Sequence, residues 1–237
     1  MNANLLLKIM ELTSEIPEIE IKYLSKITGL NYSQIMIYLK EQMYYEKEKN
    51  EILQNSNLRI NLAIFGIINL NLPPSRVINY LTWQEFEKFC LYVLEQHEFR
   101  CVRNFRFKKR KSRFEIDILG LHQSYMLCID AKLWRIRSGK PSALRKAVER
   151  QIIRTEALSK VISKYLDQLY LSRVKYVYLI PILITSMNEG IKSHKKVPII
   201  PFYQFNNFIA DLHKNIDDLP QFKIDIQKFG IQTKLLF

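Results

Sequence analysis

The chain has 237 residues, 48% of them hydrophobic, which is enough to bury one core and a smaller second one. Its formal net charge of +13 favours a polyanionic partner, and its three cysteines lack the C-x-x-C spacing of a zinc site or disulfide framework. No run of roughly 18 apolar residues occurs and the first residues turn acidic early, so we expect a cytoplasmic protein without signal peptide or membrane partner.

Residues 1–78 are predicted to form a small, mostly helical domain. Helical spacing of apolar residues indicates a first helix, then a second with Pro17 in its first turn that ends at Gly29. Asn31 is a good N-cap for a third helix with a polar face. This pattern is typical of a helix-turn-helix, and residues 43–68 are expected to add a wing of two strands and a further helix. Winged helices bind proteins as often as DNA.

The segment "NLPPSRVINY" is the expected linker, because its two prolines continue neither a helix nor a strand. The second domain is predicted to cover residues 79–237. Its core is expected at about residues 81–212, and residues 213–237 form a C-terminal extension.

The next predicted helix begins with a capping box, in which Thr82 and Glu85 bond to each other's backbone N–H. Trp83 and Cys90 lie on its apolar stripe, and Glu87 lies on the same stripe. A charge on a buried stripe is costly unless it is paired, so Glu87 is a candidate site residue. Taken alone, a place at the edge of the stripe is the simpler interpretation.

Three strand-like runs follow, at residues 100–107, 113–121 and 125–133. A long helix is predicted from about Pro141 to Tyr170, followed by the apolar strand "YVYLIPILIT". A short strand then runs into a helix in "VPIIPFYQFNNFIADL". The order predicts an α/β fold with a mixed sheet covered by helices on both faces.

The net positive charge is concentrated in two segments. Residues 100–113 hold eight Lys or Arg and no acid, and residues 132–154 hold eight more against the single acid Glu149. Such a field commonly serves phosphate contacts, and Phe105 and Phe107 interleave with it, so we expect DNA as the partner. The alternative is a solvated basic face. The candidate nucleic-acid-binding residues are Arg103, Arg106, Lys108, Lys109, Arg110, Lys111, Arg113 and Arg154.

The segment "RFEIDILGLHQSYMLCIDAKLW" places an aspartate in each of two adjacent apolar strands. A hairpin turn at Gln123-Ser124 would set Asp117 opposite Asp130 and Glu115 opposite Lys132. The acid-bearing face is predicted to comprise Glu115, Asp117, Leu119, Cys128, Asp130 and Lys132. The other face is predicted to be wholly apolar, with Phe114, Ile116, Ile118, Leu127, Ile129 and Ala131.

Two opposed carboxylates repel unless a cation lies between them. Mg²⁺ or Mn²⁺ fits, with Asp117, Asp130 and the backbone carbonyl of Ala131 as ligands. The ion would polarise a scissile phosphate and supply a hydroxide, while Lys132 would orient the water or offset charge on phosphorus. The alternative is a structural network in which Lys132 pairs with Glu115 and Asp130.

Gln151 falls within the apolar stripe of the predicted long helix. A buried amide needs a hydrogen-bond partner, so Gln151 is expected to face a polar site. With Glu87, it would complete a cluster around Asp117, Asp130 and Lys132. A place at the edge of the stripe is the alternative for Gln151 too.

Asp117 followed by Asp130-Ala131-Lys132, with the order helix, three strands, helix, strand, resembles the PD-(D/E)xK nuclease superfamily over about residues 81–212. "WQEFEKF" and Gln151-x-x-Arg154 look like its restriction-endonuclease-like branch, close to type IV restriction enzymes and distantly to archaeal Holliday junction resolvases. The resemblance implies a restriction endonuclease-like core behind a winged-helix-like domain.

Carried over to this chain, the resemblance makes Asp117 and Asp130 metal ligands and Lys132 the catalytic lysine. It also implies that Glu87 completes the metal site and that Gln151 is the accessory polar residue. The proline that names the motif is absent, because an isoleucine precedes Asp117.

The leading hypothesis is an Mg²⁺- or Mn²⁺-dependent DNA endonuclease of restriction or repair, acting on duplex or branched DNA without a small-molecule cofactor. A double-strand cutter needs two sites, which would favour a homodimer. The first alternative is a regulatory or architectural DNA-binding protein whose nuclease-like core does not cut. The second is an interaction protein in which the winged domain and "FKIDIQKFGIQTKLLF" serve dimerisation.

Overall fold

The computed structural model describes residues 3–14, 18–41, 52–54, 58–134 and 140–229. By the contacts among its residues, the chain divides into two compact units, Met1–Phe86 and Glu87–Phe237. The functional domain limits set from the sequence stay a prediction. No helix within the described residues is long and apolar enough to cross a membrane.

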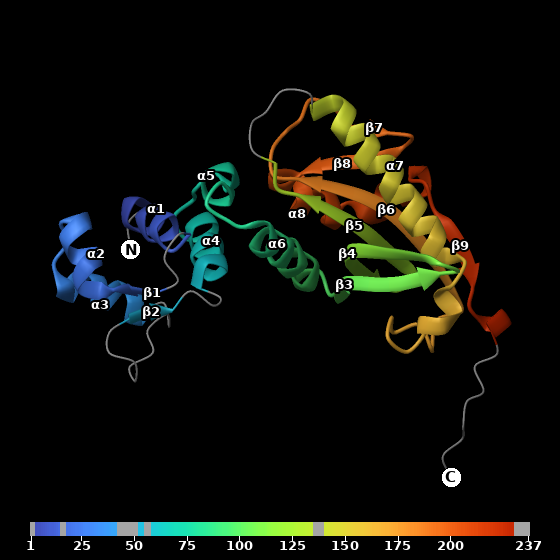
Figure 1. The fold of residues 1–237 in the computed structure, drawn as a ribbon, viewed down its shortest axis with the longest axis horizontal. Coiled ribbons are helices and arrows are strands. Elements are labelled where there is room, and N and C mark those ends of the chain that lie inside the picture. Colours follow the sequence, from blue (N-terminus) through green and yellow to red (C-terminus); the bar gives the residue numbers. More distant parts are fainter. Residues whose placement is uncertain (1–2, 15–17, 42–51, 55–57, 135–139, 230–237) are drawn as a thin grey trace, which may run out of the picture. The chain divides into compact units, whose positions relative to one another are not determined.

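The first unit is mostly helical (Figure 1). Its helices are α1 (Ala3–Leu12), α2 (Ile21–Thr28), α3 (Tyr32–Glu41), α4 (Leu58–Ile68) and α5 (Pro74–Ile78). Gly29 ends α2 with a left-handed φ of 70°, which costs a residue without Cβ little. The N–H of Gln34 donates to Oδ1 of Asn31 at 2.8 Å, and the N–H of Asn31 donates back to Oε1 of Gln34 at 3.2 Å. The predicted helix stop and N-cap are therefore confirmed.

A short antiparallel strand pair completes this unit, with β1 (Glu18–Glu20) against β2 (Ile52–Gln54). The predicted second helix begins at Ile21 and not near Pro17, which lies outside the described residues. A single apolar residue between two glutamates suits a strand that buries one face, and Ile19 is 2% exposed.

The expected wing is described only in part. β2 is the strand seen within residues 43–68, and its partner is β1, upstream of α2. Residues 42–51 and 55–57 lie outside the described part of the chain, so a second wing strand stays a prediction. The further helix expected there is α4.

A buried arginine, Arg59, connects separate segments of this unit through hydrogen bonds. Arg59 is 1% exposed, and its Nε donates to Glu85 at 2.9 Å. Its guanidinium also donates to the carbonyl of Met10 and, at 2.8 Å, to Oγ1 of Thr13. Glu85 accepts from the N–H of Thr82 at 2.7 Å as well, which confirms the predicted capping box.

The predicted linker contains one regular element, because α5 begins at Pro74. Proline lacks an N–H, and the first turn of a helix needs no such donor within the helix. A proline pair therefore permits a helix start as well as a break, and the start of α5 at Pro74 departs from the predicted irregular linker.

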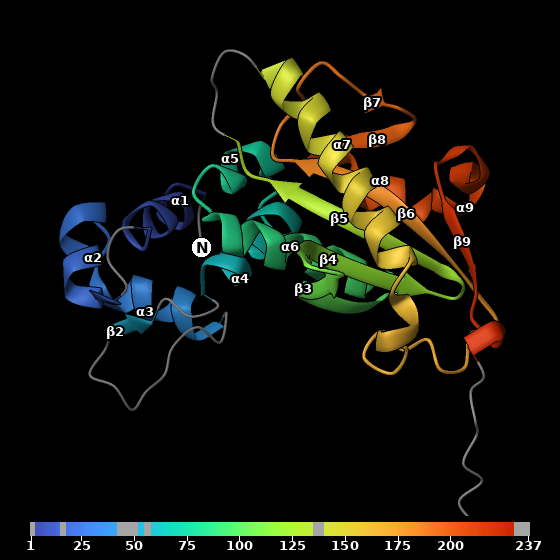
Figure 2. The same ribbon diagram turned by 45° about the vertical axis from the view of Figure 1, so that its right-hand side comes forward.

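The second unit is built on one mixed sheet (Figures 1 and 2). The strands are β3 (Arg100–Lys109), β4 (Ser112–His122), β5 (Tyr125–Lys132), β6 (Tyr176–Thr185), β7 (Ser193–His194), β8 (Val197–Pro201) and β9 (Phe222–Asp225). Their order is β3-β4-β5-β6-β8-β7, and β9 pairs with β6. β3, β4 and β5 are antiparallel neighbours, whereas β5, β6 and β8 run parallel.

Helices cover both faces of this sheet, as predicted. The main ones are α6 (Trp83–Gln96), α7 (Lys140–Ser159) and α8 (Phe202–Ala210). α7 crosses one face, with α8 on the other (Figures 1 and 2). Phe89 of α6 contacts Phe202 of α8, with ring centroids 4.7 Å apart. Gly120 of β4 lies close to Leu94 of α6, so α6 packs directly on the sheet.

The predicted long helix is shorter than expected. α7 ends at Ser159, and a 3₁₀ turn, η1 (Ile162–Tyr165), follows it. The hydroxyl of Ser159 donates to the carbonyl of Glu156 at 2.8 Å, which satisfies one of the last carbonyls of the helix. Ile162 still reaches the core, so the apolar spacing is preserved although the helix is not.

The chain beyond α8 belongs to the same core. α9 (Leu212–Asn215) and η2 (Ile216–Asp218) lead into β9, and η3 (Gln227–Phe229) follows it. Ile224 and Ile226 are buried in the hydrophobic cluster under α7. This part of the C-terminal segment therefore packs within its own chain, and residues 230–237 lie outside the described part.

Candidate active site

The two candidate aspartates lie where regular strand pairing ends. The β4–β5 register is the predicted one from the turn as far as the pair Ile118↔Ile129. Asp117 and Asp130 would be the next pair, but the described ladder stops before them. Instead, Oδ2 of Asp117 accepts the N–H of Ala131 at 3.0 Å. The carboxylate thus bonds to the neighbouring strand where a backbone carbonyl would normally do so.

The ladder between β3 and β4 is interrupted at the same residue. The pairs on either side are formed, but the pair Asn104 and Asp117 is missing from the described register. Asn104 has a left-handed φ of 52°, a conformation that Asn adopts more readily than most residues. Asp117 therefore stands outside both regular ladders.

The predicted alternation of faces along β4 is wrong because of this interruption. Ile116 and Leu119 were expected on opposite faces, yet they pack in one cluster with Cys128 and Leu158. A regular strand cannot place residues three apart on one face, so the strand turns over near Asp117. Leu158 belongs to α7, which covers the side of β5 that carries Cys128.

Asp130 is the most deeply buried acid of the site, with a side chain 2% exposed. Nζ of Lys132 lies 2.8 Å from Oδ1 of Asp130 and 3.9 Å from Oδ2 of Asp117. The structure thus brings both aspartates to one lysine. Burying a carboxylate is tolerable only with such partners.

Glu115 does not face Lys132, contrary to prediction. It pairs with its β3 neighbour Arg106, with Nε and Oε2 2.7 Å apart. The β4–β5 ladder ends before Glu115 is reached, so the predicted pairing has no strand to extend it. Of the alternative structural network, the pair of Lys132 with Asp130 forms, whereas Glu115 pairs with Arg106 and not with Lys132.

Arg154 was expected on a phosphate, and it lies on Asp130. Its NH1 is 2.8 Å from Oδ1 of Asp130, the same oxygen that Lys132 contacts. Arg154 and Gln151 are three residues apart on α7, so both can point at one strand. The three-residue spacing of Gln151 and Arg154 could have predicted that Arg154 points toward β5, as Gln151 does.

Gln151 is fully buried, and its Nε2 donates to the carbonyl of Cys128 at 2.7 Å. Among the described residues, Oε1 of Gln151 has no hydrogen-bond partner. Gln151 therefore stabilises the backbone of β5 at Cys128, two residues before Asp130. The hydrogen bond of its amide is to this backbone and not to the acids.

Glu87 lies on α6 and is 3% exposed. Its Oε2 has no hydrogen-bond partner within the part of the chain that the structure describes. Burial, and then the charge of Asp117, raise the pKa of Glu87 to about 7. Trp83 is not part of the buried stripe as predicted, since it is 57% exposed.

The pKa of Asp117 is raised to about 6, by burial first and by the charge of Asp130 second. Lys132, the N–H of Ala131 and Arg154 act in the opposite direction. The site therefore holds acids that resist ionisation together. A bound cation would favour their ionised forms.

The donor set suits a hard divalent ion, because it offers carboxylate oxygens and one carboxylate, Glu87, with an unpartnered buried oxygen. As arranged, however, no group of three or more His, Cys, Asp or Glu in the described ranges is set to hold a metal. Oδ1 of Asp130 is engaged by Lys132 and Arg154. A metal can therefore bind to that oxygen only if the side chains of Lys132 and Arg154 move away from it.

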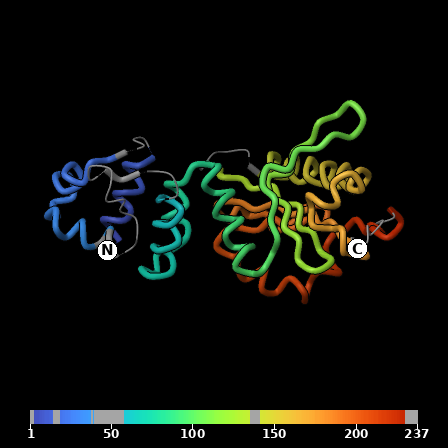
Figure 3. Tube along the Cα trace, turned by 90° about the horizontal axis from the view of Figure 1, so that it is seen from below, coloured from blue at the N-terminus to red at the C-terminus, as the bar shows by residue number. Residues whose placement is uncertain are grey.

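All the candidate phosphate-binding residues except Arg154 lie on the β3–β4 hairpin, which projects from the sheet (Figure 3). Arg103 and Lys109 are half-buried, and the exposed ones are Arg106, Lys108, Arg110, Lys111 and Arg113. Their role stays a prediction.

Residues 82–185 match the family model described as NERD, nuclease-related domain. This stretch contains α6 to β6, and with them Glu87, Asp117, Asp130, Lys132 and Gln151. The match supports a nuclease-related core in this part of the chain.

Known proteins give similar but distant matches. An uncharacterized protein of Archaeoglobus fulgidus is 29% identical over 133 residues, which cover 56% of this chain and 93% of that protein. Among solved structures, protein VC1899 from Vibrio cholerae has a TM-score of 0.40 and 11% identity, covering 90% of this chain and 51% of that one. Can2 from Sulfobacillus thermosulfidooxidans in complex with cyclic tetra-adenylate has a TM-score of 0.37 and 11% identity, covering 89% and 51%. The chain spans about half the length of these two structures.

Proposed function

We propose that this chain is an Mg²⁺- or Mn²⁺-dependent endonuclease that hydrolyses phosphodiester bonds in DNA. The observation that carries the proposal is Lys132, whose Nζ lies 2.8 Å from Asp130 and 3.9 Å from Asp117 where the β4–β5 ladder ends. Two acids and a lysine at one point are the groups that metal-assisted phosphoryl chemistry needs. The match of residues 82–185 to a nuclease-related domain supports it.

Each site residue has a role in this proposal. Asp117, Asp130, Glu87 and the carbonyl of Ala131 would hold the ion. When bound, the ion supplies Lewis-acid stabilisation of a phosphate oxygen and a water of lowered pKa. Lys132 offsets the charge that develops on the phosphate. Gln151 holds β5 in place through its bond to the strand backbone.

The basic hairpin β3–β4 would hold the DNA backbone, whether duplex or branched. The first unit, as a winged helix-turn-helix-like domain, would add a second contact to DNA or to a protein partner. Cleavage of both strands of a duplex would require two sites, which a homodimer provides.

One observation favours a second candidate, a DNA-binding protein that does not cut. Oδ1 of Asp130 already has two cationic partners, Lys132 and Arg154, each at 2.8 Å. In such a protein these side chains would take the place of the metal. It would bind DNA in a salt-dependent way and release no product.

A cleavage screen separates the two candidates. The full chain is incubated with labelled linear, branched and single-stranded DNA in Mg²⁺, Mn²⁺ or EDTA. We expect products only with a divalent ion, and their loss in Lys132→Met. Lys175→Met, an exposed lysine before β6, is the matched control and should cut normally. Binding without products on every substrate would establish the second candidate.

A further inference from the structure

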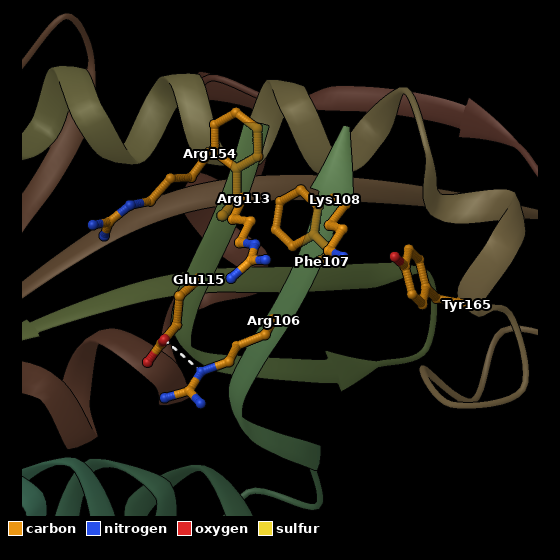
Figure 4. Close-up of a pocket in the computed structure, with 8 residues that line it drawn as sticks. Arg106, Phe107, Lys108, Arg113, Glu115, Arg154 and Tyr165 are labelled. Carbon is orange, nitrogen blue, oxygen red and sulfur yellow. Dashed lines mark hydrogen bonds and ion pairs between the residues drawn. The ribbon is translucent and has the colours of Figure 1, made fainter. Parts of the chain in front are cut away.

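A hollow of about 890 Å³ adjoins the candidate site (Figure 4). Its walls are residues 106–108 of β3, residues 113–115 of β4, Arg154 of α7 and Tyr165 of η1. Arg154 connects it to the acids, because its NH1 lies 2.8 Å from Oδ1 of Asp130. Whatever occupies the hollow therefore lies beside the proposed scissile position.

The positive charges that line the hollow outnumber the acidic side chains that line it. Its one acid, Glu115, is paired with Arg106 (Figure 4). Lys108 and Arg113 face each other directly across the β3–β4 ladder, where like charges repel. Neither has an acidic partner among the residues that the structure describes. An anion between them would remove this repulsion.

Aromatic rings form the rest of the wall. Phe107 is buried and stacks on Phe114, with centroids 5.4 Å apart and ring planes at 18°. Phe114 and Tyr165 are half-buried and line the hollow. Tyr165 is held edge-on against Phe105, with centroids 5.3 Å apart. Successive residues of a strand point to opposite faces, so Phe107 and Phe114 lie on one face of the hairpin and Lys108 and Arg113 on the other. The hollow is bordered by both pairs, and fixed rings on one side with unpaired cations on the other suit a ligand that has both flat bases and phosphates.

We propose that the hollow binds an unpaired strand of the DNA substrate next to the scissile phosphate. Lys108 and Arg113 would hold its phosphates, and its bases would stack on Phe114 and Tyr165. Bases within a duplex are already stacked on each other, so a duplex could use the cations but not the rings. The volume is that of a small-ligand pocket, which admits a few nucleotides and not a duplex. This inference rests on the nuclease function proposed above and narrows its substrate to DNA with a single-stranded tail, flap or junction.

The test measures binding in EDTA, so that it does not depend on cleavage. Fluorescence anisotropy compares a blunt duplex, the same duplex with a single-stranded DNA tail, and one whose tail is abasic and keeps only the phosphates. We expect the tailed duplex to bind about tenfold more tightly than the blunt one, because each stacked base adds roughly this much. The abasic tail should lose most of that gain.

Matched variants connect the gain to the hollow. Tyr165→Leu and Phe114→Leu should each remove most of the tail preference, whereas Tyr203→Leu, an exposed tyrosine on α8, should keep it. Arg113→Gln should weaken binding of every tailed probe and lower the salt dependence by about one ion, whereas Arg173→Gln should not. Circular dichroism confirms that the variants are folded.

The outcomes are distinct from those of the cleavage screen. Equal binding of blunt and tailed duplexes would overturn the inference, and so would an abasic tail that binds as tightly as one with bases. In each case metal-dependent cutting of plain duplex would leave the nuclease proposal standing. Tail preference without cutting on any substrate would refute the nuclease and leave a single-strand-binding pocket.

Discussion

Replacing Glu87 by glutamine should stabilise the protein at neutral pH. The buried carboxylate has a pKa raised from 4.5 to about 7, so the folded state holds its proton more tightly than the unfolded state does. That difference corresponds to about 3 kcal/mol lost from the free energy of unfolding once Glu87 is ionised. The loss is absent below pH 4.5, grows between pH 4.5 and 7, and is complete above pH 7. Glutamine carries no charge and avoids it.

Urea denaturation of Glu87→Gln and wild type at pH 8 and pH 4.5, in EDTA, measures this effect. We expect the variant to gain up to about 3 kcal/mol at pH 8 and almost nothing at pH 4.5. Glu95→Gln, an exposed acid on the same helix, is the control and should change little at either pH. A saturating divalent ion should shrink the gain, since the ion stabilises the ionised wild type. A variant no more stable than wild type at pH 8 would refute the reasoning.

Three further predictions concern the residues around the acids. Affinity for Mn²⁺, measured by calorimetry, should fall as the pH drops through about 6, because protonated Asp117 is a poor ligand; pH-independent affinity between 5 and 8 would contradict this. Gln151→Met should lower the free energy of unfolding by about 1–3 kcal/mol, since the carbonyl of Cys128 loses a donor, and unchanged urea midpoints would argue against that bond. Asn104→Val should cost about 1–2 kcal/mol at a left-handed φ while Asn104→Gly costs little; equal melting temperatures would count against the strained conformation.

The β4–β5 hairpin shows what a sequence pattern can predict. A polar turn at Gln123-Ser124 between two apolar runs is enough to fix the register, and the register is confirmed as far as Ile118↔Ile129. Mixed sheet and flanking helices follow from the order of the runs, and these are confirmed too. Local patterns succeed here because the determining contacts are between residues close in sequence.

The irregular step at Asp117 could not be predicted in the same way. Alternation assumes a regular pleat, and nothing in the apolar pattern of β4 marks the point where the strand turns over. The one signal was on the partner strand, where Asn104 stands in the middle of a strand although Asn disfavours strands and tolerates left-handed backbone. Sites that break the local rules are where function is commonly found.

Contacts between elements that are distant in the sequence could not be predicted either. The ion pair of Arg154 with Asp130 depends on where α7 rests on β5, which is set by packing of residues such as Leu158. β1 and β9 are only three and four residues long, and each pairs with a strand far along the chain. Such short strands form because a partner strand is present, and their own sequence is too short to predict them.

The central claim is that Asp117, Asp130 and Lys132 form a metal-dependent nuclease site. Single-turnover cleavage of a labelled DNA by wild type and Asp130→Asn in Mg²⁺ tests it most directly, with Asp217→Asn, an exposed aspartate, as control. We predict cutting by wild type and control that stops on adding EDTA, and a rate at least about a hundredfold lower for Asp130→Asn. Cutting by Asp130→Asn at the wild-type rate, or in EDTA, would contradict the account.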